Sequence, residues 1–120
     1  MQNEEQLEHI NVVSWFHSQY PELADDLHHF ANERKCTPWQ GKVLQRMGVK
    51  KGVPDLFLAF PWGGRCGMWL ELKVGKNKPT YEQRCFLERK AMNGYACGVA
   101  WGFYDAEKMI RMYLEGYKRA

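Results

Sequence analysis

Apolar side chains recur every third residue in the first part of the chain, at Leu7, Ile10, Val13 (with Val12 beside it) and Phe16. This spacing predicts an amphipathic helix over residues 4–20, ended by Pro21. Residues 22–37 have no clear period, and a short strand is expected near Phe30. Thr37 and Pro38 then form an N-cap and first-turn pair, which predicts a second helix that stops at Gly48.

The rest of the chain alternates between strand-like and helix-like segments. Three apolar or alternating runs are typical of strands, at residues 55–60, 68–74 and 95–101. Two further helices are expected, one from the Thr80 cap to about Asn93, and one over residues 105–117 with Met109, Met112 and Tyr113 facing inward.

This order of elements predicts a single α/β domain over residues 1–120, with a central mixed β-sheet flanked by helices. The turn Pro61-Trp62-Gly63-Gly64 should make the first two of these strands antiparallel. The helix that follows Thr80 should connect the second and third strands as a parallel pair.

Composition narrows the class of protein. At 45% hydrophobic and 14% aromatic residues, the chain can bury a core and is not a disordered segment. No run of 18 apolar residues is present, and the N-terminus is acidic where a secretory signal would be basic, so no membrane partner and a cytoplasmic location (that of a bacterium or of a viral host) are expected. The cysteines Cys36, Cys66, Cys85 and Cys97 form no CxxC pair and are expected to be free, mostly buried thiols.

Charge is distributed unevenly along the chain. Residues 1–33 hold seven acidic residues and no Lys or Arg, whereas residues 34–51 hold six basic residues and no acidic one. Such blocks fit a protein that holds a cation beside a polyanion, although a solvated helical face would give the same pattern. The candidates for contacts to a polyanion are Lys42, Arg46, Lys50, Lys51, Lys76 and Lys78.

Three residues carry the strongest chemical signal. Asp55 opens one expected strand, and Glu71 and Lys73 lie two residues apart on the next, so the latter two share a face of the sheet. Both charges interrupt an apolar strand, and burying them requires compensation. A hard divalent cation such as Mg²⁺ or Mn²⁺, held by Asp55 and Glu71 beside Lys73, would supply it. Taken alone, a Glu-x-Lys pair is more often an exposed edge pair.

The whole string, Val53-Pro54-Asp55 and then Glu71-Leu72-Lys73, resembles the PD-(D/E)xK nuclease signature, and more specifically the stand-alone, virus-type members of the VRR-Nuc family. Three further segments are similar to family motifs: Thr80-Tyr81-Glu82-Gln83, Ala31-Asn32-Glu33 and the helix acid Glu5. His9 is a departure, since many relatives have glutamine there, and Glu4 and Glu8 are alternatives to Glu5.

The resemblance implies a metal-dependent endonuclease that hydrolyses phosphodiester bonds in DNA. Asp55, Glu71 and the backbone carbonyl of Leu72 would hold the metal. Lys73 would orient water or neutralise charge in the transition state, Gln83 would position the lysine or a phosphate, and Glu5 would make a more distant contact.

Stand-alone family members resemble resolvases of four-way (Holliday) junctions, which implies branched DNA as substrate and a homodimer that makes two symmetric cuts. The alternatives are a flap- or nick-directed endonuclease and a non-catalytic nucleic-acid-binding module. Trp39 and Trp62 are candidates for stacking on unpaired bases. His9, His17, His28 and His29 lack metal-site spacing and are expected to be structural or surface residues.

Overall fold

The computed structural model describes residues 3–30 and 37–118. Its elements follow the expected alternation, with an additional 3₁₀ helix, η1, after the first helix. In chain order they are α1 (Glu4–Gln19), η1 (Pro21–Asp26), β1 (Leu27–His29), α2 (Pro38–Arg46), β2 (Leu56–Leu58), β3 (Met68–Lys73), α3 (Tyr81–Met92), β4 (Ala96–Trp101) and α4 (Phe103–Tyr113).

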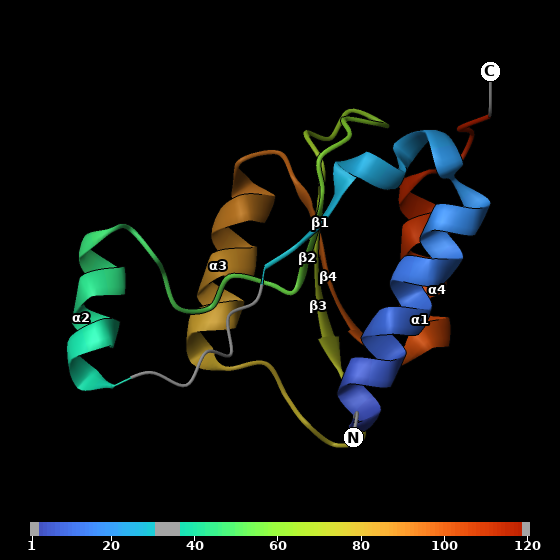
Figure 1. The fold of residues 1–120 in the computed structure, drawn as a ribbon. Coiled ribbons are helices and arrows are strands. Elements are labelled where there is room, and N and C mark those ends of the chain that lie inside the picture. Colours follow the sequence, from blue (N-terminus) through green and yellow to red (C-terminus); the bar gives the residue numbers. More distant parts are fainter. Residues whose placement is uncertain (1–2, 31–36, 119–120) are drawn as a thin grey trace.

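The four strands form one mixed sheet in the order β1-β2-β3-β4. β2 pairs antiparallel with β1 and with β3, and β3 pairs parallel with β4, so the predicted α/β class and both predicted pairings are confirmed. In Figure 1, α1 and α4 cover one face of the sheet, whereas α3 and α2 lie on the other side, with α2 farther from the strands.

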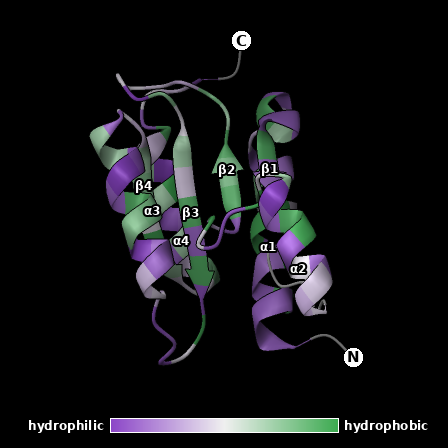
Figure 2. Cartoon of the chain, turned by 90° about the vertical axis from the view of Figure 1, so that its left-hand side faces the viewer, coloured by the Kyte–Doolittle hydropathy of each residue, from purple (hydrophilic) through white to green (hydrophobic). Residues whose placement is uncertain are grey.

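The main core lies between the sheet and the α1–α4 layer. Alternate residues of the strands, including Leu56, Leu58, Leu70 and Leu72, point into it and meet Val12 and Phe16 of α1 and Ile110 of α4. In Figure 2, β2 is green and the first turns of α1 are purple, as expected for a buried strand beside a helix with a solvent-facing side. The opposite face of β3 carries Trp69, Glu71 and Lys73 toward α3.

The expected inward face of α1 is wrong in part. Leu7 and Ile10 are each 46% exposed, whereas Val12 and Phe16 are fully buried. A repeat of three residues falls short of a helical turn, and over nine residues Leu7 and Phe16 come to lie about 180° apart around the axis. Burial therefore follows the i, i+4 pair of Val12 and Phe16, and only Phe16 of the predicted repeat is fully buried.

Two other expectations need correction. α4 begins at Phe103 and ends at Tyr113, and within it Met109 and Tyr113 pack on the core while Met112 is 65% exposed. Cys66 and Cys85 are exposed and Cys97 is half-buried, so these thiols are free as expected but not mostly buried; Cys36 lies outside the described residues. In the described ranges, every helix is too short or too polar to span a bilayer.

The corrected face of α1 can be tested by truncating one side chain on each side of the helix. Phe16→Ala should lower the free energy of unfolding by about 3–5 kcal/mol, because it removes a fully buried ring and leaves a cavity. Ile10→Ala, on the half-exposed side, should cost less than about 1 kcal/mol. Urea denaturation of both variants measures the difference. Equal losses of unfolding free energy would instead support a buried face made of the residues spaced by three.

Candidate active site

Asp55 and Glu71 hold each other through reciprocal hydrogen bonds at the end of the β2–β3 pair. The backbone N–H of Asp55 donates to Glu71 Oε1 at 3.1 Å. The backbone N–H of Leu72 donates to Asp55 Oδ2 at 2.9 Å. The Glu71 carboxylate thus accepts the N–H of Asp55 itself, and the Asp55 carboxylate accepts the N–H of the residue that follows Glu71. We refer to this arrangement as the carboxylate clasp.

The backbone carbonyl of Asp55 is fixed from the other side, by β1 and the residue after it. It accepts the N–H of Phe30 at 3.0 Å and lies 2.9 Å from His29 Nδ1. Because a carbonyl only accepts, His29 Nδ1 carries the hydrogen in this contact. The Asp55 carbonyl therefore accepts two hydrogen bonds from this side. Asp55 is thus hydrogen-bonded to residues on both neighbouring sides, His29 and Phe30 on one and the β3 residues on the other.

A histidine pair adjoins the clasp. The ring of His9, on α1, lies edge-on to His29 with 4.2 Å between centroids. Burial lowers the pKa of His9 below its ordinary value, the charge of His29 acts in the same direction, and Asp55 opposes both. These contacts agree with the expectation of structural residues, although nothing in the spacing of residues 9 and 29 reveals that packing joins them.

Glu71 is almost completely buried, at 2% exposure, and its second oxygen has two partners. Gln83 Nε2 donates to Glu71 Oε2 at 2.8 Å, and Lys73 Nζ lies 3.2 Å from the same oxygen. Burial raises the pKa of Glu71 to about 7, the nearby charge of Asp55 adds to the rise, and Lys73 lowers it. The Glu-x-Lys motif is thus a buried pair on an inner strand, which removes the exposed-edge alternative.

Gln83 reaches Glu71 because the start of α3 fixes its amide. Thr80 caps the helix, with the Gln83 N–H donating to Thr80 Oγ1 at 3.2 Å and the Thr80 N–H donating to Gln83 Oε1 at 2.8 Å. This capping box occupies the amide oxygen and leaves the amide nitrogen for Glu71. In the structure, Gln83 therefore positions the glutamate rather than Lys73.

The loop before Asp55 passes directly against the start of α3. Gly52 has φ of +84°, and a Cβ built there would lie 2.5 Å from the carbonyl carbon of Glu82 and 2.8 Å from the N of Gln83. Only glycine accepts both this backbone conformation and this approach. Gly52 thus sets the distance between the loop that carries Asp55 and the helix that carries Gln83.

The oxygen atoms around the clasp fit a hard divalent cation. Besides the two carboxylates, the carbonyl of Leu72 points to the same edge of β3 as its N–H, which faces Asp55. Continuing the pairing of Leu56 with Leu70 places Pro54 opposite Leu72, and proline has no N–H to donate to that carbonyl. Residues 3–30 and 37–118 contain no cluster of three or more His, Cys, Asp or Glu side chains suited to a metal. Two carboxylates and a carbonyl, with water completing the coordination, would form a donor set of the kind that Mg²⁺ and Mn²⁺ accept.

The structure separates the three candidate acids of α1. Glu8 Oε2 accepts the backbone N–H of Phe103 at 2.9 Å and so caps α4. Glu4 is exposed at the start of the helix. Glu5 is half-buried and lies one turn before His9 on the same face of α1, which is the face toward β1. Of the three, Glu5 is the one placed toward the clasp.

The six basic candidates have no ion-pair partner among the described residues. Lys42 and Arg46 are one turn apart on α2, Lys50 and Lys51 follow in the loop to Asp55, and all four are exposed. Lys76 and Lys78 are exposed in the loop after β3. The structure therefore brings Asp55, Glu71, Lys73 and Gln83 together in contact and leaves the six basic residues exposed outside that cluster.

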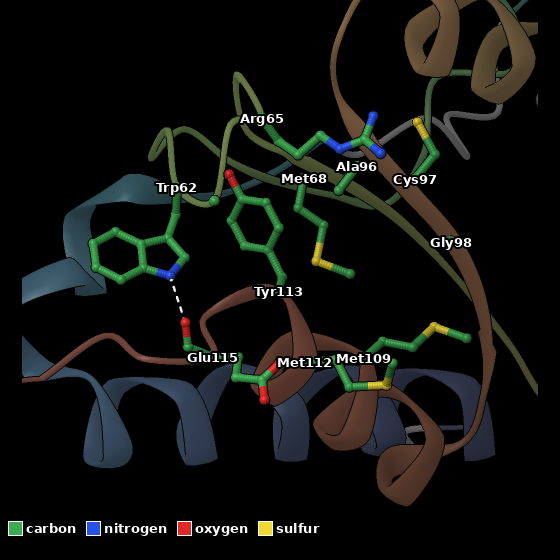
Figure 3. A pocket seen from close by; sticks show the side chains of 11 residues that line it. Trp62, Arg65, Met68, Ala96, Cys97, Gly98, Met109, Met112, Tyr113 and Glu115 are labelled. Atoms are coloured by element: carbon green, nitrogen blue, oxygen red, sulfur yellow. Dashed lines mark hydrogen bonds between the residues drawn. The ribbon is translucent and has the colours of Figure 1, made fainter.

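The two candidate tryptophans differ in position. Trp39, on α2, is 70% exposed. Trp62 donates through Nε1 to the carbonyl of Glu115 at 2.9 Å and packs on Tyr117. Trp62 lines a cavity of about 480 Å³ with Met68, Tyr113 and Met109 (Figure 3). This cavity lies beside α4 at the start of β3, whereas the clasp is at the other end of that strand, so Trp62 does not belong to the clasp.

Comparison with solved structures finds a similar fold. A solved structure described as a VRR_NUC domain protein superposes with a TM-score of 0.81 and 28% sequence identity, covering 96% of this chain and 91% of that one. No family model matches the chain, and no curated protein is significantly similar to it. The structural similarity extends over nearly the whole described fold.

The close approach at Gly52 can be tested against a second glycine in the same segment. Gly52→Ala should destabilise the protein and weaken Mn²⁺ binding, because the new Cβ pushes the Asp55 loop away from Gln83. Gly48→Ala has a similar positive φ but open space, and should cost only about 1–2 kcal/mol with metal affinity retained. Thermal unfolding measures the stability of the two variants, and calorimetry measures their Mn²⁺ affinity. Equal stability and equal affinity would mean that the contact of Gly52 with α3 does not position the Asp55 loop.

Proposed function

We propose that this chain, which has the VRR-Nuc fold, is a metal-dependent endonuclease that cleaves branched DNA. The observation that carries the proposal is the carboxylate clasp with Lys73 and Gln83 in direct contact. A protein that only binds DNA has no use for two adjacent carboxylates, one of them buried, since they would repel a phosphate. A binding module that has kept the fold is therefore the weaker explanation.

Each residue of the cluster has a part in phosphodiester hydrolysis. Asp55, Glu71 and the Leu72 carbonyl would hold Mg²⁺ or Mn²⁺, which supplies Lewis acidity to a phosphate oxygen and to water. Lys73, with its compact charge beside Glu71, would hold the attacking water or stabilise negative charge in the transition state. Gln83 keeps the Glu71 carboxylate oriented, and Glu5 would contribute from α1 through a water.

The exposed basic residues fit a phosphate backbone at the rim. Lys42, Arg46, Lys50 and Lys51 lead along the chain to Asp55, and Lys76 and Lys78 follow Lys73 on the other side. A strand lying between these groups would bring one phosphate to the clasp. Binding of this kind depends on charge and not on base sequence, which favours selection of DNA by shape.

Four-way junctions are the proposed substrate, cut by a homodimer. The domain has one clasp, and resolution of a junction needs two symmetric incisions, which a two-fold pair of chains would provide. Of the apolar residues of α1 and α4 that could form an interface, Phe16 belongs to the core, Trp15 and Tyr113 pack against it, and Met112 is largely exposed.

The catalytic assignment predicts different losses for the carboxylates and the lysine. Asp55→Asn and Glu71→Gln should each abolish Mn²⁺-dependent cleavage and weaken Mn²⁺ binding, because each removes a charged ligand. Lys73→Met should lower turnover by about 100-fold or more while metal and DNA binding are retained. Lys108→Met, an exposed lysine of α4, is the matched control and should leave activity unchanged. Full activity in either carboxylate variant would refute the metal site.

The substrate assignment predicts paired cuts. A panel of labelled junctions, flaps, nicked duplexes and plain duplexes should show two symmetric incisions in the junction, and sedimentation at micromolar concentration should show a dimer. A monomer that nicks one strand of a flap or a nicked duplex would leave the nuclease assignment standing and replace the resolvase. Absence of cleavage with every DNA and metal would refute both.

A further inference from the structure

A row of aromatic rings leads to the carboxylate clasp on the α3 side of the sheet. Trp69 precedes Glu71 by two residues, so the two side chains share a face and lie about 7 Å apart along β3. Phe57 stands opposite Trp69 on β2, and their rings stack with centroids 4.2 Å apart and planes at 22°. Phe30 stacks on the same indole, at 5.8 Å and 26°.

The row is closed at one end and open at the other. On the α3 side, Phe86 packs edge-on to Trp69 at 4.8 Å, and Lys90 Nζ lies 5.8 Å from the indole centroid. The indole N–H of Trp69 is buried with no hydrogen-bond partner among the described residues, so ring packing alone holds this side chain. At the opposite end Phe30 is 37% exposed, and it is the outermost ring of the row.

Phe30 is also hydrogen-bonded to the backbone of Asp55, one of the two residues of the clasp. Its backbone N–H donates to the Asp55 carbonyl at 3.0 Å. Phe30 is therefore bonded through its backbone to a residue proposed as a metal ligand. Lys50 and Lys51, both exposed, lie in the loop that leads from α2 to Asp55, and so bring positive charge close to Asp55 in sequence. Figure 1 shows α2 standing away from the sheet on this side, and none of its residues is buried.

We propose that Phe30 is a stacking site for an unpaired nucleobase adjacent to the cleaved phosphate. The proposal rests on the nuclease function above and adds how a branch point is selected. A base has a flat face that stacks on an aromatic ring, and it hangs from a phosphate that the rim charges attract. In a continuous duplex each base is stacked on its neighbours, whereas a branch or nick leaves a base free to turn onto Phe30.

Other occupants fit these observations less well. A protein segment would need an extended apolar surface, whereas Phe30 is a single partly exposed ring whose backbone N–H is bonded to Asp55. Trp39 is also exposed, but it lies on α2 and has no stacking partner among the described residues. Phe30 differs from it in being held rigid by Trp69 and by the Asp55 contact.

The test compares two DNAs of the same sequence, a nicked duplex with one unpaired nucleotide at the nick and the fully paired duplex. Affinities are measured by fluorescence anisotropy in EDTA, where metal-dependent cleavage is silent. The wild-type chain should prefer the unpaired form by about fivefold to 100-fold, as expected for one stacked base. Phe30→Ala should reduce this preference to less than about twofold, and Phe30→Trp should keep it. Tyr104→Ala, on the α4 side, is the control and should keep it as well.

A second readout separates stacking from damage to the clasp. With 2-aminopurine at the unpaired position, wild-type binding should quench its fluorescence and Phe30→Ala should not. Mn²⁺ affinity, measured by calorimetry, should be unchanged in Phe30→Ala, and Phe30→Leu replaces it if the alanine variant unfolds.

Three results would overturn the proposal: no preference in the wild type, a preference that survives Phe30→Ala and Phe30→Leu, or an equal loss of affinity for both DNAs. A change in the sedimentation of the DNA-free protein on Phe30→Ala would identify a contact between chains instead. Failure of the wild type to bind or cut any DNA would refute the nuclease itself, which these outcomes do not.

Discussion

The reciprocal hydrogen bonding of Asp55 and Glu71 is the interaction on which the rest of this end of the molecule depends. β2 has only three residues, so its regular pairing with β3 ends at Leu56. The two clasp bonds continue the contact beyond that point, using side chains where ladder bonds stop. They also place Asp55 so that its carbonyl can accept the N–H of Phe30, directly after β1. Three strands are therefore aligned by one aspartate.

The clasp is costly in free energy, because it brings two carboxylates together where Glu71 is nearly excluded from water. The raised pKa of Glu71 expresses that cost. Lys73 offsets part of it, and Gln83 adds a hydrogen bond from the first turn of α3, where the helix dipole also favours negative charge. A divalent cation would offset more. Under the proposed function, the clasp would therefore be more favourable with a cation bound than without one.

The sequence alone was sufficient for the α/β class, the strand pairings and the cluster of Asp55, Glu71 and Lys73, because strand alternation is a strict period of two. It was insufficient where position depends on packing between distant segments. His9 and His29 meet across 20 residues, and Glu8 is taken by the start of α4, 95 residues away. The predicted burial of Leu7 and Ile10 was wrong for a local reason, because residues spaced by three do not stay on one side of a helix. Gly52 could have been suspected from its place before Val-Pro-Asp, but its contact with α3 could not.

α2 buries none of its residues, yet it is a well-formed helix held by a Thr37–Gln40 capping box. Its folding is therefore secured by its own first turn, and the core places few demands on its other positions. Exchanges on such a surface usually change stability by about 0.5 kcal/mol or less. Substitutions on α2 are therefore expected to carry little risk to the fold. Under the proposed function, exchanges of Lys42 and Arg46 on this helix would change contacts to DNA without loss of the fold.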